Sequence, residues 1–148
     1  MKYTLRKYHD SDKMFVYDIK KEAYKAYVEK YWGLWNGADQ LKRFGEFIAD
    51  SQKDIKIILV DENRIGFVQS KNLDNGSFEI ENICITEEYQ NNGIGSSILR
   101  NLIDEHKSQD IFLQHFKDNK VGNLYRRLGF EFFEELPFHI KMIKKAEK

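Results

Sequence analysis

The chain has 148 residues, a length that fits one ordinary domain with a sizeable core. Hydrophobic residues make up 41% and aromatic residues 14%, which excludes disorder as the overall state. Basic and acidic residues number 24 each, and this balance argues against a dedicated nucleic-acid binder. With one cysteine, no apolar signal-peptide core and no run long enough for a membrane span, we expect a cytoplasmic protein without membrane contact.

The first third of the chain reads as one strand and two helices. A weakly signalled strand covers residues 2–7. A helix N-cap signal follows at 10–12, and apolar residues then recur at helical spacing over 15–27. Glycine and asparagine interrupt the chain around the aromatic segment 31–35, and a second helix is predicted over 39–49.

The rest of the chain alternates between strand and helix signals. Strands are predicted over 55–60 and 65–70, and Asn75-Gly76 predicts a hairpin turn into a strand over 77–86. The later predictions are a helix opening at Gly93, a strand over 111–113, a helix over 120–128, a strand from 129, and a strand over 138–143. The order β-α-α-β-β-β-α-β-α-β-β predicts a single α/β domain over residues 1–148, with a mixed, mostly antiparallel sheet flanked by helices.

A glycine-containing loop joins a strand to a helix in the segment Gln90-Asn91-Asn92-Gly93-Ile94-Gly95-Ser96. Backbone N–H groups that converge at a helix N-terminus attract a phosphate, and glycine removes side chains from its approach. The alternative is that the glycines only make a tight turn. The segment lacks the spacing of a GxGxxG or Walker motif, which argues against a dinucleotide site or a nucleotide triphosphatase.

The strand before this loop has an irregular apolar pattern. Strict alternation would place Ile80 and Ile83 on opposite faces, although both are apolar and Ile85 shares the parity of Ile83. A bulge near Glu81–Asn82 would bring all three to a covered surface and leave backbone groups unpaired. The alternative is a sheet covered on both faces, which needs no bulge.

Two motifs in this order resemble the GCN5-related N-acetyltransferase (GNAT) family. The family's phosphate signature, Gln/Arg-x-x-Gly-x-Gly/Ala, is matched by residues 90–95. Its second signature, Asn-x-x-x-x-Leu-Tyr-x-x-x-Gly-Phe, is matched by residues 119–130. The resemblance covers essentially the whole chain and implies the family's fold.

The resemblance also implies acetyl-CoA as co-substrate, with no metal. Its pyrophosphate would lie on the cofactor loop, residues Gln90, Asn91, Asn92, Gly93, Ile94, Gly95 and Ser96. The pantetheine arm would pair with the strand backbone at Ile83, Cys84 and Ile85, with Asn119 as a further contact. Tyr125 would protonate the leaving thiolate. Two departures stand out: the loop has asparagines where the family usually has a basic residue, and Asn119 lies six residues before the tyrosine where many relatives have seven.

Two strand glutamates, Glu79 and Glu81, are candidates for the base that deprotonates the acceptor amine. Glu79 matches the glutamate of histone-acetylating relatives, and Glu81 that of polyamine-acetylating relatives. Glu81 is preferred because it lies at the inferred bulge, and the alternative for either is a solvated edge charge. Trp32 and Trp35 are candidate acceptor contacts, with core packing as the alternative.

The function predicted from these residues is transfer of an acetyl group to a primary amine of a small molecule or peptide, by direct attack in a ternary complex. No basic residue occurs between Lys71 and Arg100, whereas five acidic residues do, so we expect a cationic acceptor. A homodimer is compatible with this prediction. The alternatives are a non-catalytic acyl-CoA-binding module and a protein-interaction domain that uses the aromatic segment 31–35.

Overall fold

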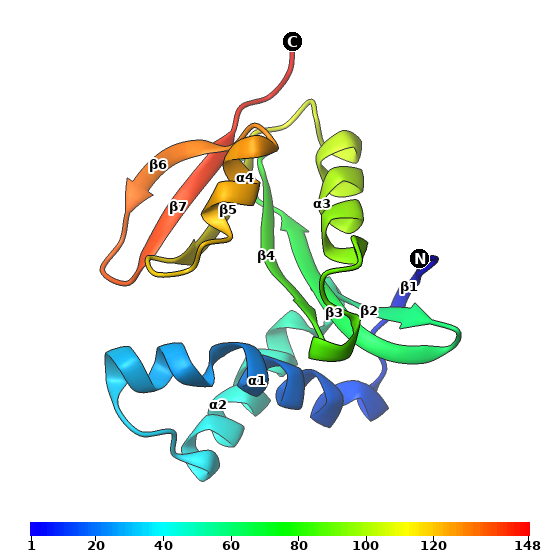
Figure 1. Ribbon diagram of the computed structural model, residues 1–148, viewed down its shortest axis with the longest axis vertical. Helices are drawn as coiled ribbons and strands as arrows, with labels where there is room; N and C mark the ends of the chain where they lie inside the picture. Colours follow the sequence, from blue (N-terminus) through cyan, green and yellow to red (C-terminus); the bar gives the residue numbers. More distant parts are fainter. The chain divides into compact units, whose positions relative to one another are not determined.

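The computed structural model describes residues 1–148 and contains seven strands and four α-helices in the predicted order (Figure 1). The strands are β1 (Thr4–Lys7), β2 (Ile55–Val60), β3 (Asn63–Asn72), β4 (Phe78–Ile85), β5 (Ile111–Phe116), β6 (Glu131–Glu135) and β7 (His139–Lys144). The helices are α1 (Lys13–Trp32), α2 (Gly37–Ser51), α3 (Ile94–Glu105) and α4 (Gly122–Arg127).

The strands form one sheet in the order β1-β2-β3-β4-β5-β7-β6. β4 runs parallel to β5, with Phe78 opposite Ile111 and Glu79 opposite Phe112. The pairs β1–β2, β2–β3, β5–β7 and β6–β7 are antiparallel. The predicted fold class, a mixed and mostly antiparallel sheet with flanking helices, is therefore confirmed.

The chain divides into two compact units. Unit 1 comprises residues 1–69 and 82–95, and unit 2 comprises residues 70–81 and 96–148. Strands β3 and β4 and helix α3 each contribute residues to both units. None of the helices combines the length and apolar character needed to cross a bilayer.

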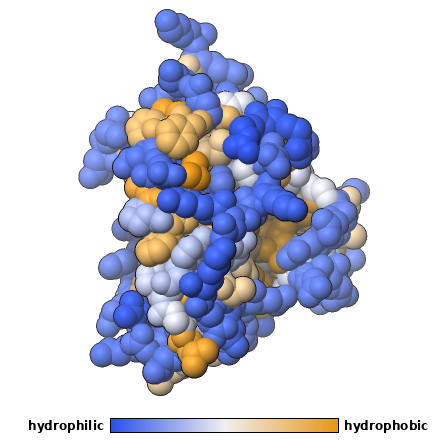
Figure 2. Space-filling model, turned by 60° about the vertical axis from the view of Figure 1, so that its left-hand side comes forward, coloured by the Kyte–Doolittle hydropathy of each residue, from blue (hydrophilic) through white to orange (hydrophobic).

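The core of unit 1 lies where α1 and α2 pack against β2, β3 and β4. Val16, Ile57 and Phe67 are completely buried there. Gly66 lets β3 approach the neighbouring backbone closely, because a Cβ at this position would overlap the carbonyl oxygen of Cys84. Most of the surface in Figure 2 is hydrophilic, with separate hydrophobic patches.

One buried charge ties three elements of unit 1 together. Arg6 of β1 donates two hydrogen bonds to the carboxylate of Asp12, at 2.8 and 3.0 Å, and Arg64 of β3 donates a third at 3.2 Å. The backbone N–H of His9 donates a fourth at 2.8 Å. Burial by itself would raise the pKa of Asp12, but these hydrogen bonds and the charge of Arg6 outweigh it and hold the pKa at about 2.

Candidate active site

The cofactor loop lies in unit 1, except for Ser96, which belongs to unit 2. After β4 the chain makes a single 3₁₀ turn over Glu87–Tyr89, and α3 begins at Ile94. Gln90 ties the start of the loop back to the strand, because its side-chain N–H donates to the carbonyl of Ile85 at 2.7 Å. This bond fixes where the chain leaves the sheet before it enters the helix.

Two residues of the loop have a positive φ, a backbone conformation that favours glycine and asparagine. Asn91 has a φ of 63° and Gly93 a φ of 87°. A Cβ built on Gly93 would meet no atom within 4 Å, so the space beside this glycine is open. The first N–H groups of an α-helix attract anions, and α3 begins directly after this glycine. These residues fit a pyrophosphate.

Cys84, one of the strand residues predicted to hold the pantetheine arm, is buried next to α1. The Sγ of Cys84 lies 3.7 Å from the hydroxyl of Tyr24 in α1, and the neighbouring Asn82 accepts a hydrogen bond from the same hydroxyl at 2.6 Å. Burial raises the pKa of Cys84 to about 11, although the hydrogen bond with Tyr24 acts the other way. The thiol is therefore neutral near pH 7, and any contact of Cys84 with a cofactor would use its backbone.

The two ends of β4 make their contacts in different units. Phe78 stacks on His106, just beyond α3, with ring centroids 3.5 Å apart. Ile85, seven residues later, lies 3.4 Å from the position of a Cβ on Gly95 near the start of α3. β4 pairs with β5 at Phe78 and Glu79. The bulge near Glu81–Asn82 stays a prediction.

The two candidate bases lie together in unit 2, in different electrostatic surroundings. Burial raises the pKa of Glu79, the negative charge of Glu81 raises it further, and Lys71 and Lys141 offset part of the rise. The carboxylate of Glu81 lies 3.2 Å from the Nζ of Lys71. Glu81 thus faces a cation, whereas Glu79 is the carboxylate whose proton affinity is increased.

Both cations were missed by the sequence argument for an acidic cleft. Lys71 lies just outside the acid-rich interval, on β3, and Lys141 lies on β7, two strands away from β4 in the sheet order. The Nζ of Lys141 lies 4.8 Å from the ring centroid of Phe112, the residue paired with Glu79. Lys71 and Lys141 therefore lie near the glutamates because their strands belong to the same sheet, not because they are close in sequence.

Tyr125 and Asn119 also lie in unit 2, around α4. Tyr125 is half-buried, with its ring centroid 6.1 Å from the rings of both His115 and Phe130. The side-chain oxygen of Asn119 accepts the backbone N–H of Val121 at 3.0 Å, where the chain turns into α4. Asn119 therefore has a local structural bond, and its amide N–H₂ is the part that remains for a cofactor.

The two tryptophans differ in exposure and do not both lie between the helices as predicted. Trp32 is the last residue of α1, 55% exposed, with its ring edge against Tyr31. Helical geometry continues past the aromatic residues and ends at Gly33, whose φ of 100° suits glycine. Trp35 lies in the connection to α2 and lines a pocket of about 180 Å³ between the two helices.

Comparisons with known proteins agree with this arrangement. Residues 51–132, more than half of the chain, match the model of the acetyltransferase (GNAT) domain. The chain belongs to the GNAT family. A spermine/spermidine N(1)-acetyltransferase from Bacillus subtilis is 36% identical over 78 residues, which cover 49% of this chain and 51% of that protein. The chain thus matches about half the length of this curated relative.

Solved GNAT structures share the fold over nearly the whole chain. PaiA N-acetyltransferase from Thermoplasma acidophilum, solved with coenzyme A, has a TM-score of 0.69 at 20% identity and covers 99% of this chain and 100% of its own. A histone acetyltransferase HPA2-related protein from Corynebacterium glutamicum has a TM-score of 0.78 at 17% identity, covering 100% and 98%. At these identities the likeness shows the GNAT fold alone.

Proposed function

We propose that this GNAT protein transfers an acetyl group from acetyl-CoA to a primary amine, with cationic amines as the preferred acceptors. The observation that carries the proposal is the loop of residues 90–95, which has the family's phosphate signature and opens directly into α3. The partial match to a polyamine acetyltransferase supports the cationic acceptor class.

Acetyl-CoA would supply a thioester whose carbonyl carbon is attacked by the amine nitrogen, with cleavage of the carbon–sulfur bond. The cofactor loop would hold the pyrophosphate through backbone N–H groups and the dipole of α3, since positions 91 and 92 provide no basic side chain. The backbone of Ile83, Cys84 and Ile85 would hold the amide-bearing arm, with Asn119 as a further contact.

Glu79 is our preferred base. A free amine is the reactive form, and a cationic acceptor therefore loses a proton before or during attack. A carboxylate with a raised pKa accepts that proton more readily at neutral pH than an ordinary one, and Glu79 has this property. Glu81, with Lys71 beside it, would keep the pKa of Glu79 raised through its negative charge. The two carboxylates, Glu79 and Glu81, would together attract an ammonium group.

Tyr125 would give its hydroxyl proton to the departing thiolate. Its phenol is a donor of suitable strength, and the half-buried position keeps the ring fixed. Trp32, exposed at the end of α1, remains our candidate for contact with the acceptor.

The experiment is a thiol-release assay with purified protein, acetyl-CoA and a panel of acceptors at low ionic strength. We expect spermidine, amino sugars and lysine-containing peptides to release coenzyme A faster than glutamate or neutral amines. Faster release with acidic or neutral acceptors would overturn the cationic class. Tight binding of acetyl-CoA without turnover on any amine would instead favour the non-catalytic binding module.

A further inference from the structure

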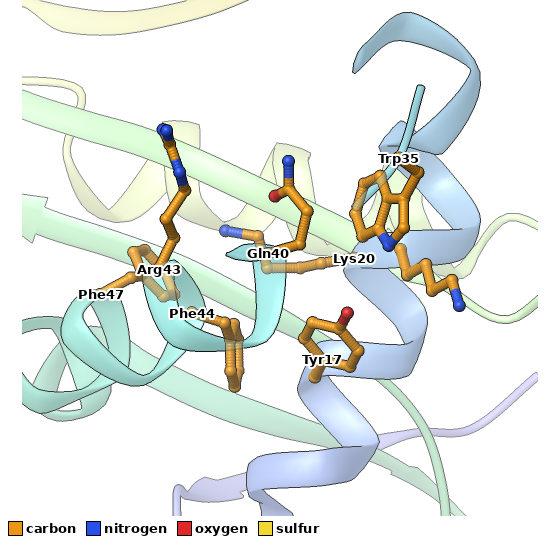
Figure 3. Close-up of a pocket in the computed structure, with 8 residues that line it drawn as sticks. Tyr17, Lys20, Trp35, Gln40, Arg43, Phe44 and Phe47 are labelled. Carbon is orange, nitrogen blue, oxygen red and sulfur yellow. The ribbon is translucent and has the colours of Figure 1, made fainter. Parts of the chain in front are cut away.

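A pocket between α1 and α2 has the chemistry of an anion site, and it lies entirely within unit 1 (Figure 3). Its walls are aromatic: Tyr17, Trp35, Phe44 and Phe47 contribute rings. A cavity of about 150 Å³ in an engineered protein accommodates benzene, so a pocket of about 180 Å³ has room for one aromatic ring with a small substituent.

The charged side chains that line this pocket are all cations: Lys20 and Lys21 of α1 and Arg43 of α2. The Nζ of Lys20 lies 3.7 Å from the ring centroid of Phe47, which holds this ammonium against the aromatic wall. Arg43 donates from Nε to Asp39 at 2.9 Å, which engages one edge of its guanidinium. The terminal nitrogens are the edge that takes oxyanions in a bidentate manner.

One of the residues that line the pocket has a buried donor without a partner. The indole Nε1 of Trp35 is inaccessible to solvent and makes no hydrogen bond. Indole N–H donates only, and a buried donor without an acceptor is unfavourable. Figure 3 shows this nitrogen on the side of the indole towards the hydroxyl of Tyr17. The backbone N–H of Trp35 donates to Glu29 at 3.0 Å, which fixes the residue in place.

We infer that this pocket binds an aromatic oxyanion, a planar ring with a carboxylate or phosphate, and that the indole of Trp35 turns on binding to bring its buried N–H within reach of the ligand oxygen. The ring packs among the aromatic walls, and the lysines and Arg43 neutralise the charge. The ligand has the opposite charge to the acceptor class proposed above, so Trp35 serves a second ligand and not the reacting amine. The inference does not depend on acetyl transfer.

The test uses the indole N–H signals of ¹⁵N-labelled full-length protein. The chain has two tryptophans, and Trp32→Phe assigns the two signals. We expect millimolar benzoate or phenyl phosphate to shift the Trp35 signal saturably and to leave the Trp32 signal in place. Comparing the two probes tells a carboxylate ligand from a phosphate ligand. Benzyl alcohol and benzylamine keep the ring without the negative charge and are expected to bind at least tenfold more weakly.

Charge variants separate anion binding from simple ring burial. The double variant Lys21→Gln/Arg43→Gln is expected to weaken benzoate binding at least tenfold. Lys25→Gln/Lys42→Gln removes the same charge from exposed positions outside the pocket, one on each helix, and is expected to bind as the wild type does. A Trp35 signal that benzoate and phenyl phosphate leave in place, or equal binding of benzyl alcohol and benzoate, would overturn the inference.

Discussion

Gly122 makes room for the imidazole of His115. A Cβ built on Gly122, the first residue of α4, would lie 2.7 Å from Nε2 of His115. The imidazole has little freedom to retreat, because its Nδ1 lies 2.7 Å from the carbonyl oxygen of Phe116. Since that carbonyl only accepts, Nδ1 carries a proton, and the buried Nε2 has no hydrogen-bond partner.

Gly122→Ala is therefore expected to destabilise the protein by about 1–3 kcal/mol in denaturant unfolding, because the methyl group overpacks this site. Gly37→Ala is the matched control: Gly37 also begins a helix, but a Cβ there would meet no atom within 4 Å. We expect Gly37→Ala to be neutral or slightly stabilising. The addition of His115→Ala should recover part of the Gly122→Ala loss, and full additivity of the two changes would contradict the clash.

Gly93→Val tests the phosphate loop. We expect acetyl-CoA affinity to fall more than tenfold, about 1.4 kcal/mol or more, because a branched side chain enters the open space and the backbone at φ of 87° resists it. Gly76→Val is the matched control, since Gly76 also has a φ of 87° with nothing within 4 Å of its Cβ position. Denaturant unfolding should show the same backbone penalty to stability in both variants, and calorimetric titration with acetyl-CoA should show a loss of affinity only in Gly93→Val.

The pH dependence of turnover distinguishes the two strand glutamates. A base with a raised pKa is protonated, and inactive, at a higher pH than an ordinary glutamate, whose pKa is about 4.3. The acid limb of kcat/KM should therefore lie above that value and should disappear in Glu79→Gln, with a loss of roughly 10²- to 10⁴-fold. Glu81→Gln removes the neighbouring negative charge, so the limb should move to lower pH while turnover persists. The reverse pattern would make Glu81 the base.

Tyr125→Phe removes a proton donor and keeps the ring. Turnover is expected to fall roughly 10- to 1000-fold with little change in acetyl-CoA affinity. The ring contacts with His115 and Phe130 remain in this variant, so its unfolding curve should match the wild type. An unchanged turnover number, measured where chemistry limits the rate, would remove Tyr125 from the mechanism.

The free energy of unfolding, measured at decreasing pH, tests the ion pairs of Asp12 with Arg6 and Arg64. The pKa of Asp12 is depressed in the folded state, to about 2, so its contribution is present above the unfolded value near 3.9 and is lost as the pH falls towards 2. A shift of this size corresponds to roughly 2–3 kcal/mol. Asp12→Asn should be less stable at neutral pH and should show a smaller change between pH 4 and pH 2.

Local sequence signals predicted an element well where its hydrophobic pattern begins and ends clearly. The apolar run Ile55–Val60 has the predicted bounds, because it has the length of a strand, is rich in β-branched residues and has polar residues on both sides. The predicted helix and strand stopped before the observed ends of α1 and β5. Tyr31 and Trp32 read as part of a break, and His115 and Phe116 follow the polar Gln114, which interrupts the apolar signal.

The candidate site was predictable where its residues are adjacent in sequence and not where they meet through packing. The loop at Gly93 follows from two glycines before a helix. The neighbours of Glu79, Lys71 and Lys141, come from other strands, and a sequence without a sheet register does not reveal which charge faces which. The pocket at Trp35 depends on how α1 packs on α2, so the sequence showed the aromatic residue and not its cavity.

The placement of the two tryptophans has a practical consequence for measuring how the protein unfolds. Trp32 and Trp35 are the only tryptophans of the chain, and both belong to unit 1. The intrinsic emission of the protein therefore reports on the region around α1 and α2, whereas the amide signal in circular dichroism averages over all strands and helices. Superimposed melting curves from the two probes would mean that the units unfold cooperatively, and separated curves would reveal an intermediate with one unit intact.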